Sequence, residues 1–195
     1  MPRAGLTPER VIAEAAAVAD EAGLERLTLA AVAKRCGVSL PGLYKHVEGL
    51  DAVKRGIAIL AVGEMTARLA AATSGVTGRD ALAELSAAYR AYAAARPGRY
   101  AASVRAPAPG DGEHAAVAEQ AVAVVASAFK GYRLEGGDLV HAIRMWRIAC
   151  HGFASLEGET AFGLPESLDE TFGRLVDALD EAFRRMAPGS PSSEA

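Results

Sequence analysis

The chain has 195 residues, 21 Lys+Arg against 24 Asp+Glu, and a net charge of -3. Apolar residues make up 51% and the mean hydropathy is +0.13, which excludes a disordered chain and indicates one globular domain, or one with a small appended domain. Alanine dominates, with 44 residues against 5 Phe, 5 Tyr and 1 Trp. Because Ala is the best helix former, the composition predicts an all-α fold. The net acidity argues against a nonspecific coat for nucleic acid.

The chain carries no signal for export or membrane insertion. Its N-terminus lacks an apolar segment, and its most apolar stretch, residues 56–72, is interrupted by Glu64 and Arg68. Two cysteines, Cys36 and Cys150, cannot make a disulfide framework and lack metal-ligand spacing. We therefore expect a cytoplasmic protein with no membrane partner, no cofactor and no metal.

Cap residues and apolar spacing predict an architecture of about nine helices. Thr7, Thr28 and Ser39 are N-cap residues, and Gly23 and Gly37 are stops. The predicted helices span residues 8–22, 29–36, 40–46, 52–72, 79–95, 113–131, 137–158 and 166–186, with an exposed loop at 106–112. The expected domains are a helix-turn-helix DNA-binding domain (1–50), a ligand-binding and dimerisation helical domain (51–187) and a flexible tail (188–195).

Residues 28–47 have helix-turn-helix spacing, with a short capped helix after a glycine turn. Ser39 offers a phosphate both a hydroxyl and a helix-end N–H, Tyr44 offers its hydroxyl, and Lys45 supplies charge. The expected base-facing positions are Leu40, Pro41 and Gly42, which offer few hydrogen bonds. Leu40 is therefore a candidate to contact a thymine methyl group, and further specificity is expected to come from DNA shape.

Two aromatic side chains of this segment admit more than one role. Tyr44 is either a phosphate ligand or a half-buried side chain that packs on the first helix. His46 either contacts base or phosphate or caps the helix C-terminus as a cation.

The charge is divided unevenly along the chain. Residues 26–55 contain six cations and two anions, so this segment is +4 and the remainder is -7. A basic patch at the motif is what positioning on a phosphate backbone requires.

The stretch LTLAAVAKRCGVSLPGLYKHVEGLDAV resembles the DNA-binding domain of TetR-family transcriptional regulators. The matching residues are Thr28, Val32, Ala33, Gly37, Val38, Ser39, Leu43, Tyr44, His46 and Val47. The resemblance implies DNA contacts from Thr28, Ser39, Leu40, Pro41, Gly42, Tyr44, Lys45, His46 and Lys54. One position departs from the family: Leu50 stands where a phosphate-contacting Lys is frequent, and Lys54 or Arg55 one turn on is a substitute.

The segment from Trp146 to Glu157, with His151 and Gly152, resembles the "W…HG" (WHG) subgroup of TetR C-terminal domains. That resemblance implies an unidentified small-molecule effector inside a helical bundle and a homodimer formed through the last two helices. The expected ligand-binding residues are Met65, Tyr89, Tyr92, Phe129, Trp146, His151 and Phe153. For each of the apolar and aromatic residues, ordinary core is the favoured alternative. For His151, the alternatives are a hydrogen bond to a buried backbone carbonyl and a place at the dimer interface.

Two further groups are open to more than one interpretation. The apolar stripe of residues 168–183 is either a core face or a dimer face, and the resemblance favours the dimer. His141, Cys150, His151 and Glu157 have poor helical spacing for a metal site.

The expected function is a ligand-responsive regulator, most often a repressor, that binds a palindromic double-stranded DNA operator as a dimer. An enzyme is the first alternative, but the chain lacks an HExxH motif, a P-loop, a GxGxxG motif and a nucleophile elbow. The second alternative is a dimeric interaction protein that keeps the fold without reading DNA.

Overall fold

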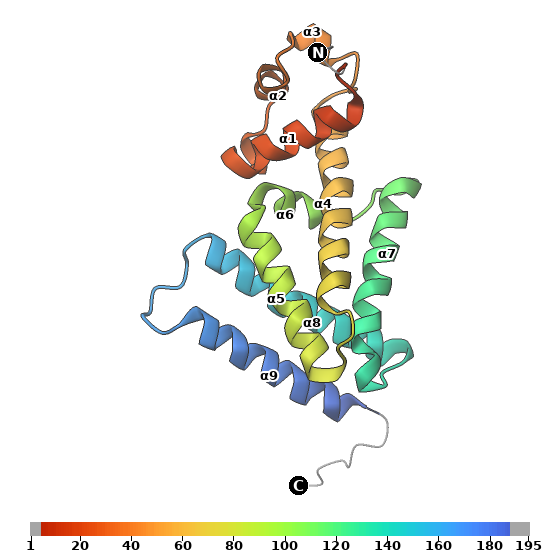
Figure 1. The fold of residues 1–195 in the computed structure, drawn as a ribbon, viewed down its shortest axis with the longest axis vertical. Coiled ribbons are helices and arrows are strands. Elements are labelled where there is room, and N and C mark those ends of the chain that lie inside the picture. The colour runs from red at the N-terminus through yellow and green to blue at the C-terminus, as the bar shows by residue number, and fades with distance from the viewer. Residues whose placement is uncertain (1–4, 188–195) are drawn as a thin grey trace. The chain divides into compact units, whose positions relative to one another are not determined.

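The structure is a computed structural model, and it describes residues 5–187. Over these residues it contains nine α-helices, two short 3₁₀ helices and no strand, which confirms the all-α prediction (Figure 1). The elements are α1 (Pro8–Ala22), η1 (Leu24–Arg26), α2 (Leu29–Cys36), α3 (Leu40–Leu43), α4 (Leu50–Ala72), α5 (Gly78–Ala95), α6 (Pro97–Ser103), α7 (Gly112–Ala128), η2 (Phe129–Tyr132), α8 (Gly136–Gly158) and α9 (Leu168–Met186). The predicted tail, 188–195, lies outside the described residues.

The N-caps read from the sequence form as expected. The side chain of Thr7 accepts a hydrogen bond from the backbone N–H of Arg10. In the same way, Thr28 accepts from the N–H of Ala31, and Ser39 accepts from the N–H of Gly42. Each cap satisfies one of the backbone donors that a helix start leaves unpaired.

Four helix boundaries differ from the prediction by two residues or more, and one of them is the start of α9, which lies at Leu168 and not at residue 166. The third helix was expected to reach His46, but its regular part ends at Leu43 and residues 44–46 form a turn. Helix α4 begins at Leu50, two residues earlier than predicted. The predicted helix to residue 131 ends as an α-helix at Ala128 and tightens into η2.

Helix α6 was not predicted. Arg96 leaves the helical conformation (φ -138°, ψ 59°), as a residue before proline tends to do. Pro97 then starts a new helix, because the first helical position needs no backbone N–H.

The chain forms two compact units. Unit 1 consists of residues 1–65 and 95–119, and unit 2 of residues 66–94 and 120–195. The division follows packing, so it groups α6 and the start of α7 with the N-terminal helices. The expected functional boundary at residue 50 stays a prediction.

Unit 1 has an aliphatic core to which α1, α2, α3 and α4 contribute, with Ala102 from α6. Helix α6 lies close to α1, since a Cβ built on Gly98 would be 2.1 Å from the backbone carbon of Ala19. Beside this contact, the Arg99 guanidinium pairs with Asp20 and Glu64, and the backbone N–H of Arg99 donates to Asp20 at 2.9 Å. These contacts fix the N-terminal helices on α6.

Unit 2 is filled by aromatic side chains. Trp146 packs edge-on against Tyr89 with ring centroids 5.4 Å apart. Two further groups bring together Phe129, Tyr132 and Phe183, and Phe153, Phe162 and Phe172. Within residues 5–187 no helix is both long enough and apolar enough to cross a membrane.

Candidate nucleic-acid interface

Helices α2 and α3 are held together by a tight turn and buried aliphatic side chains. Gly37 closes α2 in the left-handed conformation (φ 69°), which glycine adopts without strain. Val32 of α2 and Leu43 of α3 are fully buried. The buried side of α3 is therefore fixed, and its other side is presented to solvent.

The outer side of α3 is apolar. Leu40 is 39% exposed, Pro41 is exposed and Gly42 is half-buried. The Ser39 hydroxyl lies at the start of this helix, where it accepts the Gly42 N–H at 3.3 Å. The side chains of α3 itself thus carry no hydrogen-bonding group, as the sequence suggested.

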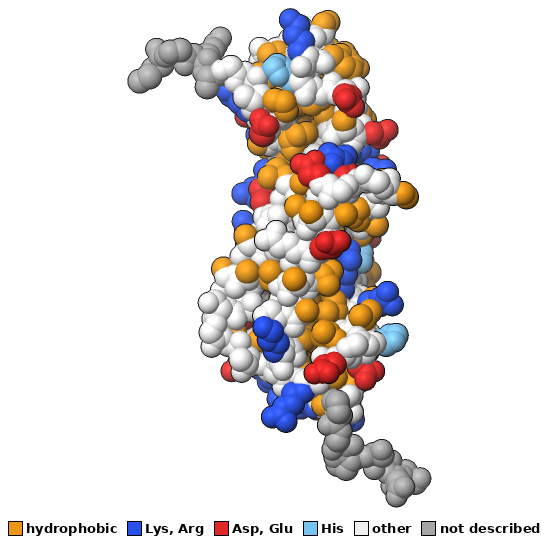
Figure 2. Space-filling view, turned by 90° about the vertical axis from the view of Figure 1, so that its right-hand side faces the viewer, with side chains coloured by type: hydrophobic (Ala, Val, Ile, Leu, Met, Phe, Trp, Pro, Cys, Tyr) orange, Lys and Arg blue, Asp and Glu red, His pale blue; other side chains and the backbone are white. Residues whose placement is uncertain are grey.

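The turn after α3 presents polar side chains. Tyr44 is 53% exposed and Lys45 is exposed, whereas His46 is half-buried. The alternative interpretation, in which Tyr44 packs half-buried on α1, does not describe this side chain. At the top of Figure 2, basic and histidine side chains project from this end of unit 1.

The remaining predicted DNA contacts lie on α2 and α4. Thr28 is exposed, but its hydroxyl oxygen already caps α2. Lys54, on the first turns of α4, is half-buried and forms no ion pair with the described residues. Arg55 next to it is paired with Asp111 and Glu113, so of the two residues expected to substitute for a lysine at position 50 only Lys54 has no ion pair among the described residues.

Arg55 binds two acidic residues that the sequence did not single out. Its guanidinium donates to both carboxylate oxygens of Asp111 at 2.6 Å and to Glu113 at 2.8 Å. Arg55 and the backbone N–H of His114 lower the pKa of Asp111 to about 2, and the two acids raise the pKa of Arg55. Because the two acids lie 56 and 58 positions away along the chain, the sequence carries no local signal of this pairing.

Arg35 of α2 is neutralised in the same way by Glu14 and Glu21 of α1, at 3.0 and 2.7 Å. Of the six cations in residues 26–55, Arg26, Lys34, Lys45 and Lys54 form no ion pair within the described part of the chain. The charge of +4 read from the segment therefore includes two guanidinium groups whose charge is compensated by acids outside it.

The expected ligand-binding residues fall into separate groups. Met65 lies in unit 1, and the other six lie in unit 2. Tyr89 and Trp146 are in contact, whereas Phe129 and Phe153 belong to two different ring groups. Tyr92 is fully buried with Arg68 over its ring, and His151 is half-buried.

The apolar stripe of α9 faces the chain's own core, because Phe172, Val176, Leu179 and Phe183 are buried. The dimer interpretation of this stripe is therefore not supported. No group of three or more metal-ligating side chains is found in residues 5–187.

Comparisons with known proteins agree with this geometry. Residues 11–46 match the model for bacterial regulatory proteins of the tetR family, and residues 82–179 match the tetracyclin repressor-like C-terminal domain. The HTH-type transcriptional regulator Rv0681 of Mycobacterium tuberculosis is 34% identical over 79% of this chain and 71% of its own length. YobS of Bacillus subtilis is 31% identical over 87% of this chain and 88% of its own.

A solved structure of TetR from Acinetobacter baumannii in complex with minocycline shares the fold, with a TM-score of 0.70 and 22% identity over 95% of this chain and 100% of that one. The exposed α3, its turn onto α2 and these matches define a helix-turn-helix DNA-binding regulator. The chain belongs to the TetR family of transcriptional regulators.

Proposed function

We propose that this protein is a small-molecule-responsive repressor that binds a palindromic operator as a homodimer. The observation that carries the proposal is the exposed segment from Ser39 to His46, presented by unit 1 beside the unpaired cations Lys34 and Lys54. In a helix-turn-helix dimer, such segments enter the major groove of two half-sites about one helical turn apart, roughly 34–36 Å.

Phosphates and bases are read by different residues. The phosphates are bound by Ser39, Tyr44, Lys45 and Lys54. At the edge of the same surface lie His46 and Thr28. The bases face Leu40, Pro41 and Gly42, which offer no side-chain hydrogen bond, so Leu40 contacts a thymine methyl group. Remaining specificity comes from DNA shape.

We place the dimer contact on α8, because the apolar stripe of α9 is buried in the chain's own core. On α8, Met145, Ile148 and Leu156 are exposed apolar residues on one face, and Ile148 is 71% exposed. Gly152 lies between them, and a Cβ built there meets no atom within 4 Å, so a second helix can approach closely. This segment also carries the Trp146 and His151-Gly152 pattern on which we assign the chain to the WHG subgroup.

The effector binds in unit 2. The candidates are the aromatic residues Tyr89, Tyr92, Phe129, Trp146 and Phe153, with His151 as the polar group; Met65 lies in unit 1 and is not part of this site. The tetracycline-type ligand named for the A. baumannii relative supports a small molecule as the class of effector. Effector and operator then affect each other's affinity reciprocally, typically by 1–3 kcal/mol.

The test is fluorescence anisotropy with DNA that flanks the protein's own gene, over a series of salt concentrations. We expect Lys45→Ala to weaken binding on all sequences and to reduce the salt slope by about 1. Tyr44→Phe is expected to weaken binding without a change in slope, because it removes a hydrogen bond and no charge. Lys130→Ala, an exposed lysine in unit 2, is the matched control.

Two results would contradict the proposal. Unchanged affinity in both variants, together with an unchanged salt slope in Lys45→Ala, would remove these residues from the DNA face. If the wild-type chain binds no DNA at any salt concentration, the dimeric interaction protein is favoured instead.

A further inference from the structure

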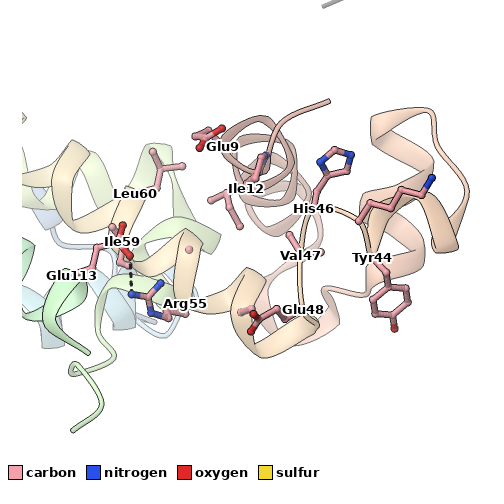
Figure 3. A pocket seen from close by; sticks show the side chains of 14 residues that line it. Glu9, Ile12, Tyr44, His46, Val47, Glu48, Arg55, Ile59, Leu60 and Glu113 are labelled. Carbon is pink, nitrogen blue, oxygen red and sulfur yellow. Dashed lines mark hydrogen bonds and ion pairs between the residues drawn. The ribbon is translucent and has the colours of Figure 1, made fainter. Parts of the chain in front are cut away.

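Unit 1 contains a cavity of about 750 Å³ that is lined in part by the end of the recognition segment, residues 39–46. Its walls come from the first turns of α1, the turn at residues 44–48, α4, and Glu113 of α7 (Figure 3). A volume of this size is within the usual range for small-molecule sites, about 300–1,000 Å³. The cavity could not be predicted from the sequence, because its walls come from four separate stretches of the chain.

The floor of the cavity is apolar and consists of packed aliphatic side chains. Ile12, Val47, Ile59 and Leu60 contribute aliphatic side chains to the lining. Ile12 lies directly against α4, since a Cβ built on Gly56 would be 2.5 Å from its Cδ1 atom. The site therefore offers an apolar molecule a surface that is already formed.

The charges around this floor are mainly negative. Arg55 lines the cavity, but its charge is compensated by Asp111 and Glu113. Glu9 and Glu48 also line it, and neither forms an ion pair with the described residues. Figure 3 draws these two carboxylates at opposite edges of the lining, with Ile12 and Val47 between them in that view. Lys45 is the one lysine or arginine of the lining that forms no ion pair with the described residues, and the imidazole of His46 also lines the cavity.

The balance of these charges disfavours an anion. Glu9, Glu48 and Lys45 together carry one negative charge, and the cluster of Arg55 with its two acids carries another. Hydrogen bonds from its own backbone N–H and from Thr7 lower the pKa of Glu9, so this carboxylate remains ionised. A phosphate or carboxylate ligand is repelled. A cation with an apolar surface is complementary to the cavity, because its surface packs on the aliphatic floor and its charge is attracted by the carboxylates.

We propose that this cavity is a second ligand site, on the DNA-binding unit, for a compact apolar organic cation such as a quaternary ammonium or phosphonium ion. The apolar groups of the ligand pack on Ile12, Ile59 and Leu60, and its charge lies between Glu9 and Glu48. The site is separate from the effector residues proposed for unit 2 and does not depend on them.

The test is isothermal titration calorimetry of the full chain with two probes of the same shape and opposite charge. Tetraphenylphosphonium and tetraphenylborate each carry four phenyl groups. We expect the phosphonium ion to bind, and the borate to bind at least about tenfold more weakly.

Variants place the binding in this cavity. In the double variant Glu9→Gln, Glu48→Gln, the affinity for tetraphenylphosphonium should fall about tenfold. The matched control, Glu25→Gln with Glu84→Gln, removes two exposed carboxylates that do not line the cavity and should leave the affinity unchanged. Ala52→Leu narrows the cavity without changing its charge, and should weaken binding while the circular dichroism spectrum is retained.

Three results would overturn the proposal: no binding of tetraphenylphosphonium, equal or tighter binding of tetraphenylborate, or an affinity for the phosphonium ion that the Glu9, Glu48 and Ala52 variants leave unchanged. Operator binding by the same preparations is measured in parallel. Failure of the cation site is thereby distinguished from failure of the DNA-binding function.

Discussion

The two units fill their interiors with different side chains. The buried cluster of unit 1 consists of aliphatic residues, six of them alanine, and contains no aromatic ring. Unit 2 holds all five phenylalanines and the single tryptophan. Unit 1 gains its contacts by close backbone approach, as at Gly98 and Ala19, and unit 2 gains them by ring packing.

Because of this difference, the exposure of a large side chain helps to identify a functional residue in unit 1 but not in unit 2. In unit 1, Tyr44 stays on the surface at 53% exposure, although Tyr100 of the same unit is buried. In unit 2, nearly every large side chain has a packing partner, so size alone does not separate a ligand contact from core. Four predictions, from the largest expected effect to the smallest, test this contrast.

Gly98→Ala should destabilise unit 1 by about 3 kcal/mol, because the new methyl group meets the backbone of Ala19 and not a flexible side chain. Gly63→Ala is the control: it lies in α4 with open space around its Cβ, and should stabilise by about 0.5–1 kcal/mol. Urea unfolding followed by circular dichroism measures both. Equal stability of wild type and Gly98→Ala would show that α1 and α6 are not in close contact.

Tyr132→Phe should destabilise unit 2 by about 2 kcal/mol. The Tyr132 hydroxyl donates to buried Asp180 at 2.7 Å, and Arg184 is the other partner of this carboxylate. Burial opposes ionisation of Asp180, but the hydrogen bonds from Arg184 and Tyr132 lower its pKa. Fluorescence of Trp146, which lies in unit 2, reports the unfolding.

The control is Tyr44→Phe, the same change on an exposed tyrosine, which should alter stability by less than about 0.5 kcal/mol. If both variants lost equal stability, the Tyr132 hydrogen bond would contribute nothing.

The apolar face of α3 is tested by a change in the DNA. Once an operator has been selected, replacing a contacted thymine by uracil removes one methyl group and should weaken binding by about 0.8 kcal/mol, roughly fourfold. In Leu40→Ala the same replacement should have no effect, because the partner of the methyl group is gone. A loss of equal size in both proteins would show that Leu40 does not contact the methyl group.

The Arg55–Asp111 pair should give the smallest effect and a defined dependence on pH. The pKa of Asp111 is lowered from 3.8 to about 2 in the folded protein. The stabilisation is therefore complete above pH 4 and is lost as the pH falls towards 2. Wild type should be more stable than Asp111→Asn at pH 6, and the difference should shrink between pH 4 and pH 2. A difference that is constant over this range would contradict the pairing.

The sequence predicted the elements whose signals are local. Cap residues at Thr7, Thr28 and Ser39 gave the starts of α1, α2 and α3, and a family motif of ten residues identified the recognition segment. Helix α6 was missed because Pro97 was interpreted as the end of the preceding helix or a kink in it, and not as the start of a new helix. The partners of Arg35 and Arg55 were missed because ion pairs between distant segments leave no pattern along the chain.

The contact of α6 with α1 limits how the molecule can be divided. A fragment that ends at Met65 loses Gly98 and Arg99, so it exposes the α1 surface around Ala19 and leaves the Asp20 carboxylate without the cation that faces it. The helix-turn-helix of this protein therefore depends on α6 for part of its packing. Transplanting its DNA specificity onto another regulatory bundle requires that α6 be transplanted with it.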